Sequence, residues 1–424
     1  MTAPVYAFPP VPREAFVPLR VADLVEWLGR DTGPTGDSAL TDAELEQFHD
    51  FASSAIASTH DRYLTSLKRL ERDYAPFDPD RELPLLDEPG EAERQKRLDD
   101  LFDQFAAMME RANFKRLSRP ELELIMRGAS DWGVDMHVPW DAYEKMDLYV
   151  RGQGLGRRTR RKWYRFFVQE EVTVPTFGRV VLILKQRPHK SLGKGADTQH
   201  AFIKLFKDIP TMDVEMLLPG TRIRMPLLDR LRLGGSGLGT LGYIIFKMQV
   251  MIAPLIKAVG LVTTGAVFGE QGIVGLIALY TPLALIGGYA YKTYASFNTT
   301  KRSYELQLSK SLYFQNLDNN AGVLYRLLDA AEEQEAREML LAYFYLWKYG
   351  GTDGWTEAHL DAYVELELAR RLQKEIDFDI GDAIRKLESS GLIVRYGDRL
   401  KAKPMGEARD AMRRAAAIAR GEPA

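Results

Sequence analysis

The densest group of side chains that could bind a ligand is a basic segment between Arg151 and Arg165. It reads RGQGLGRRTRRKWYR and holds seven cations and two aromatic residues. Its glycines lack the full spacing and the Lys-Ser/Thr ending of a Walker motif, so nucleotide binding is not predicted. Three interpretations stay open: a solvated turn beside strands, contact with anionic lipid headgroups, and nucleic-acid binding. The residues predicted for headgroup contact are Arg157, Arg158, Arg160, Arg161, Lys162 and Arg165.

A single lysine, Lys257, stands near the middle of an otherwise largely apolar segment, Met248–Phe268. A lysine at the centre of a bilayer costs about 3 kcal/mol on insertion scales. Its ammonium group could reach the headgroups along a tilted helix, or face a partner helix or a water-filled cavity. A third interpretation places the whole segment at the membrane interface. Lys257 is therefore a candidate intramembrane functional residue.

Other reactive or metal-binding patterns are absent from the sequence. The chain has no cysteine, which excludes disulfides, thiolate zinc sites and a cysteine nucleophile. The six histidines show no HxxxH or HxH spacing, so a histidine metal site is not predicted. No catalytic residue, cofactor or metal is predicted, and an enzymatic function is not favoured.

Two apolar segments predict a transmembrane hairpin. Residues Gly272–Tyr291 contain twenty residues without a charge, which as a helix would cross the roughly 30 Å hydrocarbon core. The segment 248–268 is the weaker span because it contains Lys257. Cations flank both spans, whereas the turn 269–271 has none, so both termini are expected in the cytoplasm.

The first residues, MTAPVYAFPPVPREAFVPLR, lack the charged start and continuous apolar stretch of a signal peptide. We therefore expect a multi-pass protein of a bacterial inner membrane, or of a mitochondrial membrane if the source is eukaryotic. Its predicted partners are the lipid bilayer, with anionic headgroups, and a protein partner or further copies of the chain. Nucleic acid is not a favoured partner.

Helical periodicity dominates the first part of the chain. Thr41-Asp-Ala-Glu44 is a capping box that precedes apolar residues at helical spacing as far as Ile56. A second helix is predicted over 91–113, and Ser118-Arg-Pro-Glu121 begins a third. The N-terminal region is therefore expected to be a helical bundle.

After Trp140 the apolar period shifts toward two, which predicts a small α+β domain ending near Arg224. Residues 179–185 have the composition of a central strand, and 201–207 alternate like a half-exposed one.

From Tyr304 to Trp347 the pattern predicts two helices, with a break in the region 318–322. Their acidic residues are expected to form a solvated face: Glu332, Glu333, Glu335 and Glu338.

The C-terminal part follows the order of a winged helix. A helix through Leu360 and Leu368 is followed by a helix at 380–387 and then by a hairpin that turns at Gly397-Asp398. The second helix carries only Arg385 and Lys386 among more numerous carboxylates, which disfavours phosphate binding. Protein interaction or a structural role is favoured over nucleic-acid binding.

Two long stretches, Leu205–Arg230 and Tyr313–Trp347, closely resemble a family of unknown function that includes transmembrane protein 143 of animal mitochondria. They read LFKDIPTMDVEMLLPGTRIRMPLLDR and YFQNLDNNAGVLYRLLDAAEEQEAREMLLAYFYLW. With the apolar segments between them, the resemblance covers about residues 162–347. It implies a two-helix membrane protein with an uncharacterised domain, and it assigns no catalytic residue.

The predicted fold class is an α+β membrane protein. Its predicted parts are an N-terminal helical region (1–135), a membrane-proximal α+β domain (136–235), a transmembrane hairpin (236–295), a helical region (296–350), and a winged-helix-like domain with its tail (351–424). The favoured function is a non-enzymatic, membrane-anchored scaffold or protein-interaction protein. The alternatives are an oligomeric channel or transporter subunit, and a membrane-associated enzyme that acts on lipid.

Overall fold

The computed structural model describes residues 13, 15–33, 39–82, 86–130, 135–161, 169–192, 195–224, 288, 291, 295, 299 and 313–419. Contacts divide the chain into two units. The first comprises Met1–Ile125, Pro139–Gly220 and Asn316–Ala424, and the second comprises Met126–Val138 and Thr221–Gln315. The first unit thus draws on the N-terminal, central and C-terminal parts of the chain, and the linear boundaries predicted from the sequence stay predictions.

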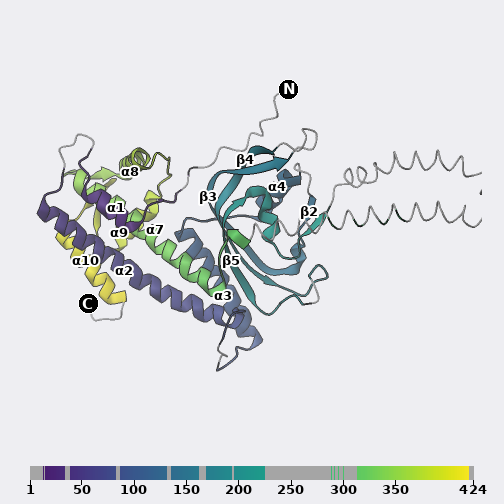
Figure 1. Ribbon diagram of the computed structural model, residues 1–424. Helices are drawn as coiled ribbons and strands as arrows, with labels where there is room; N and C mark the ends of the chain where they lie inside the picture. The colour runs from purple at the N-terminus through teal and green to yellow at the C-terminus, as the bar shows by residue number, and fades with distance from the viewer. Residues whose placement is uncertain are drawn as a thin grey trace, which may run out of the picture. The chain divides into compact units, whose positions relative to one another are not determined.

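Figure 1 shows the helices and strands of the first unit. Its helices are α1 (Val21–Gly29), α2 (Asp42–Tyr74), α3 (Glu91–Arg111), α7 (Asn320–Tyr349), α8 (Glu357–Leu372), α9 (Ile380–Ser389) and α10 (Met405–Ala419). Its strands are β1 (Lys115–Arg116), β3 (Tyr143–Arg161), β4 (Gln169–Gln186), β5 (Ala201–Pro210), β7 (Asn316–Asn319), β8 (Trp355–Thr356), β9 (Ile393–Tyr396) and β10 (Arg399–Ala402). Short 3-10 turns are η1 (Ala75–Phe77), η2 (Trp140–Ala142) and η4 (Thr211–Leu217).

Helix α4 (Arg119–Ser130) begins in the first unit and ends in the second. Its start confirms the predicted cap, because Glu121 Oε2 accepts a hydrogen bond of 2.8 Å from the Ser118 amide. The hydrogen bond from Lys115, together with those from Ser118, lowers the pKa of Glu121 to about 2. In the second unit, strand β2 (Asp135–His137) pairs antiparallel with β6 (Arg222–Arg224).

A five-stranded antiparallel sheet, in the order β1-β3-β4-β5-β7, forms the centre of the first unit. The register pairs Tyr149 with Val181 and Ile183 with Ile203. The run Val180–Leu184 of β4 is buried at every position, as the prediction of a central strand required. Strand β5 alternates between buried and more exposed positions over much of its length, which also agrees with the sequence pattern.

Two hydrophobic clusters share helix α7. Its first half, Val323–Ala331, packs with α2, α3 and one face of the sheet, where Tyr149, Val181 and Ile203 contribute. Its second half, Ala336–Leu346, packs with α1, α2, α8, α9 and α10. Around the junction of the two halves lie four buried polar residues: Gln334, Glu335, Arg337 and Glu338.

Helix α2 begins at the predicted capping box. The Thr41 hydroxyl oxygen accepts a hydrogen bond from the Glu44 amide (3.3 Å), and the Thr41 amide donates to Glu44 Oε2 (2.9 Å). The hydrogen bonds that Glu44 Oε2 accepts from the Thr41 amide and from the Thr41 hydroxyl lower the pKa of Glu44. Two backbone donors that a helix start leaves free are thereby satisfied.

Replacing Thr41 by alanine is expected to lower the free energy of unfolding by about 1 kcal/mol, because the Glu44 amide loses its acceptor. Urea denaturation followed by circular dichroism measures this loss. Ser54→Ala is the matched control, since its hydroxyl bonds only to the Asp50 carbonyl within the same helix. An equal effect of both variants would contradict a role for the cap.

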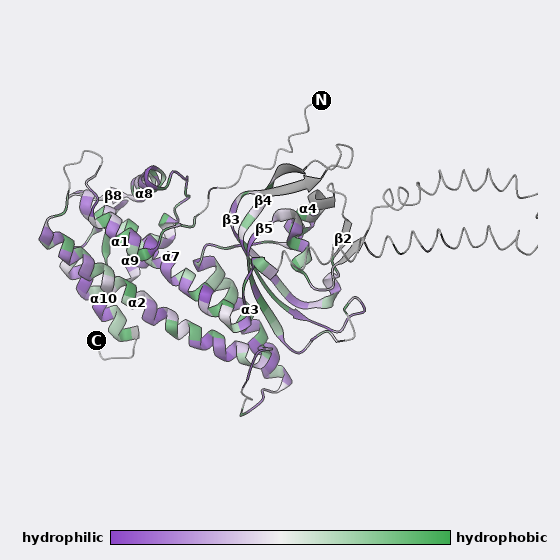
Figure 2. Ribbon diagram, in the orientation of Figure 1, coloured by the Kyte–Doolittle hydropathy of each residue, from purple (hydrophilic) through white to green (hydrophobic). Residues whose placement is uncertain are grey.

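The structure contradicts the predicted membrane-protein fold class. Within the part of the chain that it describes, no helix is both long enough and apolar enough to cross a membrane. The long helices α2 and α7 carry hydrophilic residues along their length (Figure 2), whereas a span needs about 20 predominantly apolar residues. The multi-pass inner-membrane localisation is contradicted by the same finding. The predicted spans, 248–268 and 272–291, lie outside the described residues.

Candidate functional site

The C-terminal module, defined here as residues 355–402, follows the predicted order of helix, helix and hairpin. Thr356 caps α8 by accepting from the His359 amide, and Asp379 caps α9 by accepting from the Asp382 amide. Strands β9 and β10 form the hairpin, which turns through Gly397 at a φ of 62°. Strand β8 pairs with β10 and completes a three-stranded sheet, β8-β10-β9.

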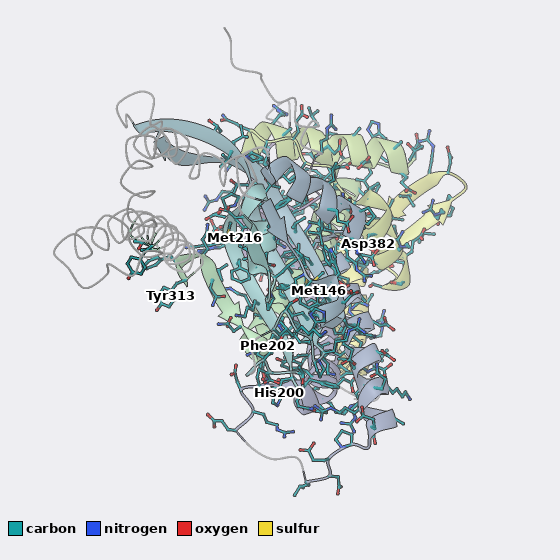
Figure 3. All side chains as sticks on the ribbon, turned by 90° about the vertical axis from the view of Figure 1, so that its right-hand side faces the viewer. Met146, His200, Phe202, Met216, Tyr313 and Asp382 are labelled. Atoms are coloured by element: carbon teal, nitrogen blue, oxygen red, sulfur yellow. The ribbon has the colours of Figure 1, made fainter. Side chains whose placement is uncertain are left out.

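Lys386 of α9 is held among carboxylates instead of facing solvent. Its Nζ atom lies 3.2 Å from Glu338 Oε2 and 3.8 Å from Glu335 Oε2, and it also pairs with Asp382 of its own helix. Figure 3 marks the position of Asp382. The lysine side chain is 13% exposed. Burial disfavours the charged lysine, but Glu335, Glu338 and Asp382 together outweigh that effect and raise its pKa.

The two carboxylates of α7 that hold Lys386 have further partners on α2 and after α3. The Tyr63 hydroxyl donates to Glu335 Oε2 (2.7 Å), and Arg62 forms an ion pair with Glu335 Oε1 (2.7 Å). Glu338 Oε1 accepts from Gln334 (2.8 Å) and from Asn113 (3.1 Å). Burial raises the pKa of Glu338 despite the attraction of Lys386.

These contacts correct one sequence-based prediction. Glu335 and Glu338 were expected on a solvated face, but they are 2% and 1% exposed. Local periodicity marks an acidic face but does not reveal that α2 and α9 cover it. A buried charge needs paired partners, and here they come from residues distant in sequence.

Two further cations of the module, Arg385 and Arg395, are also paired within the chain. Arg385 lies 3.1 Å from Asp382. Arg395 on the hairpin lies 2.7 Å from Glu388 and 3.8 Å from Glu357. Phosphate contact by these side chains would require breaking ion pairs that already exist.

Carboxylates gather where α8 approaches the start of α9. The pKa of Asp361 is raised to about 6. Burial is the largest cause, and four neighbouring carboxylates add to it: Glu365, Asp377, Glu357 and Asp379. Arg13 offsets part of this charge, with its guanidinium 3.5 Å from Glu365. The four neighbouring carboxylates make the local potential negative.

Replacing Asp361 by asparagine is expected to stabilise the protein at pH 7.5 by about 1 kcal/mol, after allowance for solvent screening. A carboxyl group whose folded pKa is raised destabilises the folded state above that pKa, and the effect fades as the pH falls to its unfolded value. The gain should therefore shrink below pH 6 and vanish near pH 4. Urea titrations across this range test the trend, and a gain independent of pH would contradict it.

The structure describes part of the predicted basic site. Four of its residues belong to strand β3 rather than to a turn, and their register partners are Thr173 for Arg157, Val172 for Arg158, Glu170 for Arg160 and Gln169 for Arg161. Lys162, Arg165 and Lys257 lie outside the described residues. Headgroup contact and the role of Lys257 stay predictions.

Arg151, at the start of the same segment, has a packing role. Its guanidinium carbon lies 3.9 Å from the ring centre of Phe16 and 4.3 Å from that of Phe114. It also donates to the Ala112 carbonyl (2.8 Å). Its cationic group therefore joins the end of α3 to the sheet by stacking and hydrogen bonding.

Comparison with known proteins identifies one domain. Residues 177–322 match the family described as "Protein of unknown function (DUF3754)". This domain of unknown function overlaps strands β4, β5 and β7 and the start of α7. The relation to transmembrane protein 143 stays a prediction. No solved structure matches the chain.

Proposed function

We propose that the chain is a non-enzymatic interaction protein whose C-terminal module contacts a protein partner. The observation that carries this proposal is the pairing of Lys386, Arg385 and Arg395 with carboxylates of the same chain. A surface that binds a nucleic acid keeps cations available for phosphates, and this module engages those cations internally.

Charge around α8 and α9 indicates the chemistry of the partner. The cluster around Asp361 gives this region a negative potential. Such a potential repels a phosphate backbone and attracts a cationic protein surface. The proposed partner therefore presents Lys and Arg side chains.

Tyr396 supplies an apolar anchor for such a partner. It lies on β9 and is 64% exposed. Exposed aromatic side chains contribute strongly to interfaces because they bury a large area with little loss of side-chain freedom. An exposed aromatic anchor in an acidic module fits a partner that offers an apolar pocket together with cations.

Site-specific photocrosslinking tests the proposal in the expressing cell. A benzoylphenylalanine replaces Tyr396 in one variant and Leu86, which is fully exposed outside the module, in the control variant. A defined protein adduct at Tyr396, absent at Leu86 and weakened when Asp361 and Asp377 become Asn, is expected. No adduct, or the same adducts at both positions, would overturn the proposal.

Binding to duplex DNA tests the alternative that the module binds nucleic acid. Fluorescence anisotropy at low salt should show no specific binding, because Arg385, Lys386 and Arg395 are already paired with carboxylates of the same chain. Tight, salt-sensitive binding that is lost in Arg395→Gln would contradict protein contact as the module's role. In the described part of the chain, no observation favours the channel or lipid-enzyme alternatives.

A further inference from the structure

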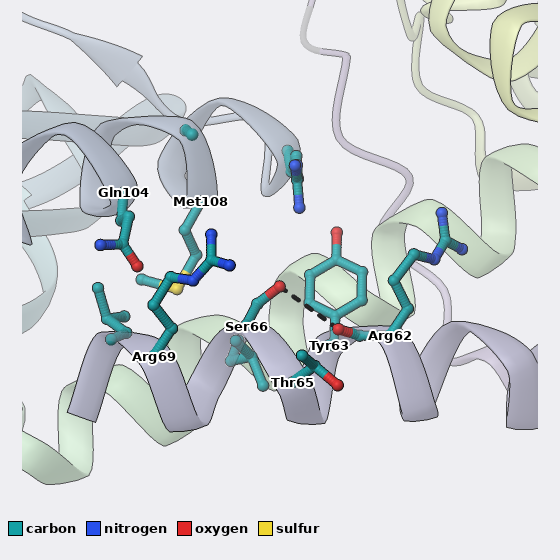
Figure 4. A pocket seen from close by; sticks show the side chains of 11 residues that line it. Arg62, Tyr63, Thr65, Ser66, Arg69, Gln104 and Met108 are labelled. Carbon is teal, nitrogen blue, oxygen red and sulfur yellow. Dashed lines mark hydrogen bonds between the residues drawn. The ribbon is translucent and has the colours of Figure 1, made fainter. Parts of the chain in front are cut away.

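A pocket of about 400 Å³ lies between helices α2 and α3, with Leu328 of α7 among its lining residues. Three arginines line it: Arg62 and Arg69 from α2, and Arg111 from α3. Figure 4 shows Arg62 and Arg69 projecting from the same side of α2, with Gln104 and Met108 facing them from α3. No carboxylate is among the pocket's described lining residues.

Two of the arginines have no counter-ion in the described part of the chain. Arg69 and Arg111 make no ion pair there, and the Arg111 guanidinium lies 6.0 Å from the centre of the Tyr63 ring. Arg62 differs, because its ion pair with Glu335 holds it in place. Two uncompensated positive charges at one concave site favour a ligand with two negative charges.

The pocket combines polar and apolar side chains. Arg62 and Arg69 are two helical turns apart, so their Cα atoms are about 10 Å apart along α2, and the Ser66 hydroxyl lies between them. Its apolar lining includes Leu70, Met108 and Leu328, which are 3%, 6% and 7% exposed. A ligand can therefore place an anionic group among the arginines and an organic body on the apolar side chains.

We infer that this pocket binds a phosphate monoester. Near pH 7 such a group carries a charge of about −2, which matches Arg69 and Arg111 together, whereas a carboxylate neutralises only one of them. Its terminal oxygens accept the paired N–H groups of guanidinium. Burial and, to a smaller extent, the charge of Glu335 raise the pKa of Tyr63. The Tyr63 hydroxyl therefore stays protonated and donates its hydrogen bond to Glu335.

Isothermal titration of the full chain with phenyl phosphate tests the inference, with benzoate and phenyl sulfate as monoanionic comparators. Each of Arg69→Gln and Arg111→Gln should weaken phenyl phosphate binding about tenfold, because each removes charge-assisted hydrogen bonds. The double variant should abolish it. Lys68→Gln is the matched control: it removes a cation from the adjacent position of α2, outside the pocket, and should leave binding unchanged.

Sedimentation with phosphatidylcholine vesicles, with and without phosphatidic acid, distinguishes a lipid source from a soluble ester. Arginine-dependent binding of phenyl phosphate supports a soluble ligand, and arginine-dependent binding of phosphatidic acid alone supports a lipid headgroup. Binding of neither probe, equal affinity for benzoate, or equal losses in Lys68→Gln would overturn the inference. The site lies outside α9 and the hairpin, so its failure leaves the proposed function intact.

Discussion

Replacing Lys386 by methionine should lower the free energy of unfolding by about 3–5 kcal/mol, because the variant leaves the buried Glu338 without its cation and Glu335 with Arg62 alone. Glu338 lies 3.2 Å from the lysine nitrogen and Glu335 lies 3.8 Å away. Methionine keeps the apolar part of the side chain but supplies no charge. Urea denaturation at pH 7.5, followed by tryptophan fluorescence, measures the loss.

The pH dependence of that loss identifies its cause. In the variant, Glu338 keeps the burial that raises its pKa and loses the lysine that lowers it. A carboxyl group with a raised folded pKa takes up a proton more readily in the folded than in the unfolded state. The deficit of the variant should therefore shrink as the pH falls.

Two further variants distinguish the loss of the buried ion pairs from the mere loss of a lysine. Lys401→Met removes an exposed cation of β10 and should change the stability by less than about 0.5 kcal/mol. Adding Glu338→Gln to Lys386→Met should recover part of the loss, since one buried charge is removed. A Lys386 variant as stable as the unmodified protein would show that the buried network does not stabilise the fold.

Replacing Phe344 by alanine should lower the free energy of unfolding by about 3–5 kcal/mol, because a buried ring leaves a cavity that the core cannot fill completely. Phe344 is fully buried in the second half of α7. Its ring centre lies 5.0 Å from that of Phe48 on α2 and 5.6 Å from that of Tyr345. The loss therefore combines apolar burial with aromatic contacts.

Urea denaturation of the variant and of the unmodified protein measures this loss of stability. Near-ultraviolet circular dichroism is a suitable signal because aromatic residues surround the cavity. Tyr396→Ala is the control, as it removes an exposed ring from the hairpin. The control should change the stability by less than about 0.5 kcal/mol. Similar losses in both variants would mean that Phe344 packs less closely than the structure shows.

Local sequence signals predicted several elements correctly. The capping box places the start of α2 at Asp42, and the predicted central strand at 179–185 contains the buried run Val180–Leu184 of β4. Helices α8 and α9 and the hairpin also follow the predicted order. These signals succeed because a cap, a period of two and a glycine turn each depend on neighbouring residues.

Features that depend on distant residues were missed. The residues Asn316–Asn319 were expected to lie within or beside helices, yet they form strand β7, which pairs with β5. Asparagine and aspartate have low strand propensity, so tertiary pairing determines this strand. Likewise, the polar residues of the arginine pocket look like ordinary solvated positions of α2 and α3 until the two helices are placed side by side.

The membrane prediction rested on the apolar composition of two segments, without knowledge of any structural partner. Hydropathy alone measures how strongly a segment avoids water. The described helices show what that measure leaves out: α7 keeps a run of buried residues, Gln334–Leu346, and is covered by protein on all sides of that run. The apolar residues of this run are kept from water by packing against the rest of the protein.

Folding during synthesis depends on helix α7. The apolar surfaces of α2, α3 and the sheet are completed by a helix that the ribosome makes only after all of them. Until that helix emerges, the nascent chain presents uncovered apolar surface, which favours aggregation and chaperone binding. We therefore expect chains that stop before Asn320 to be recovered mainly in aggregates, although they contain all five strands of the main sheet.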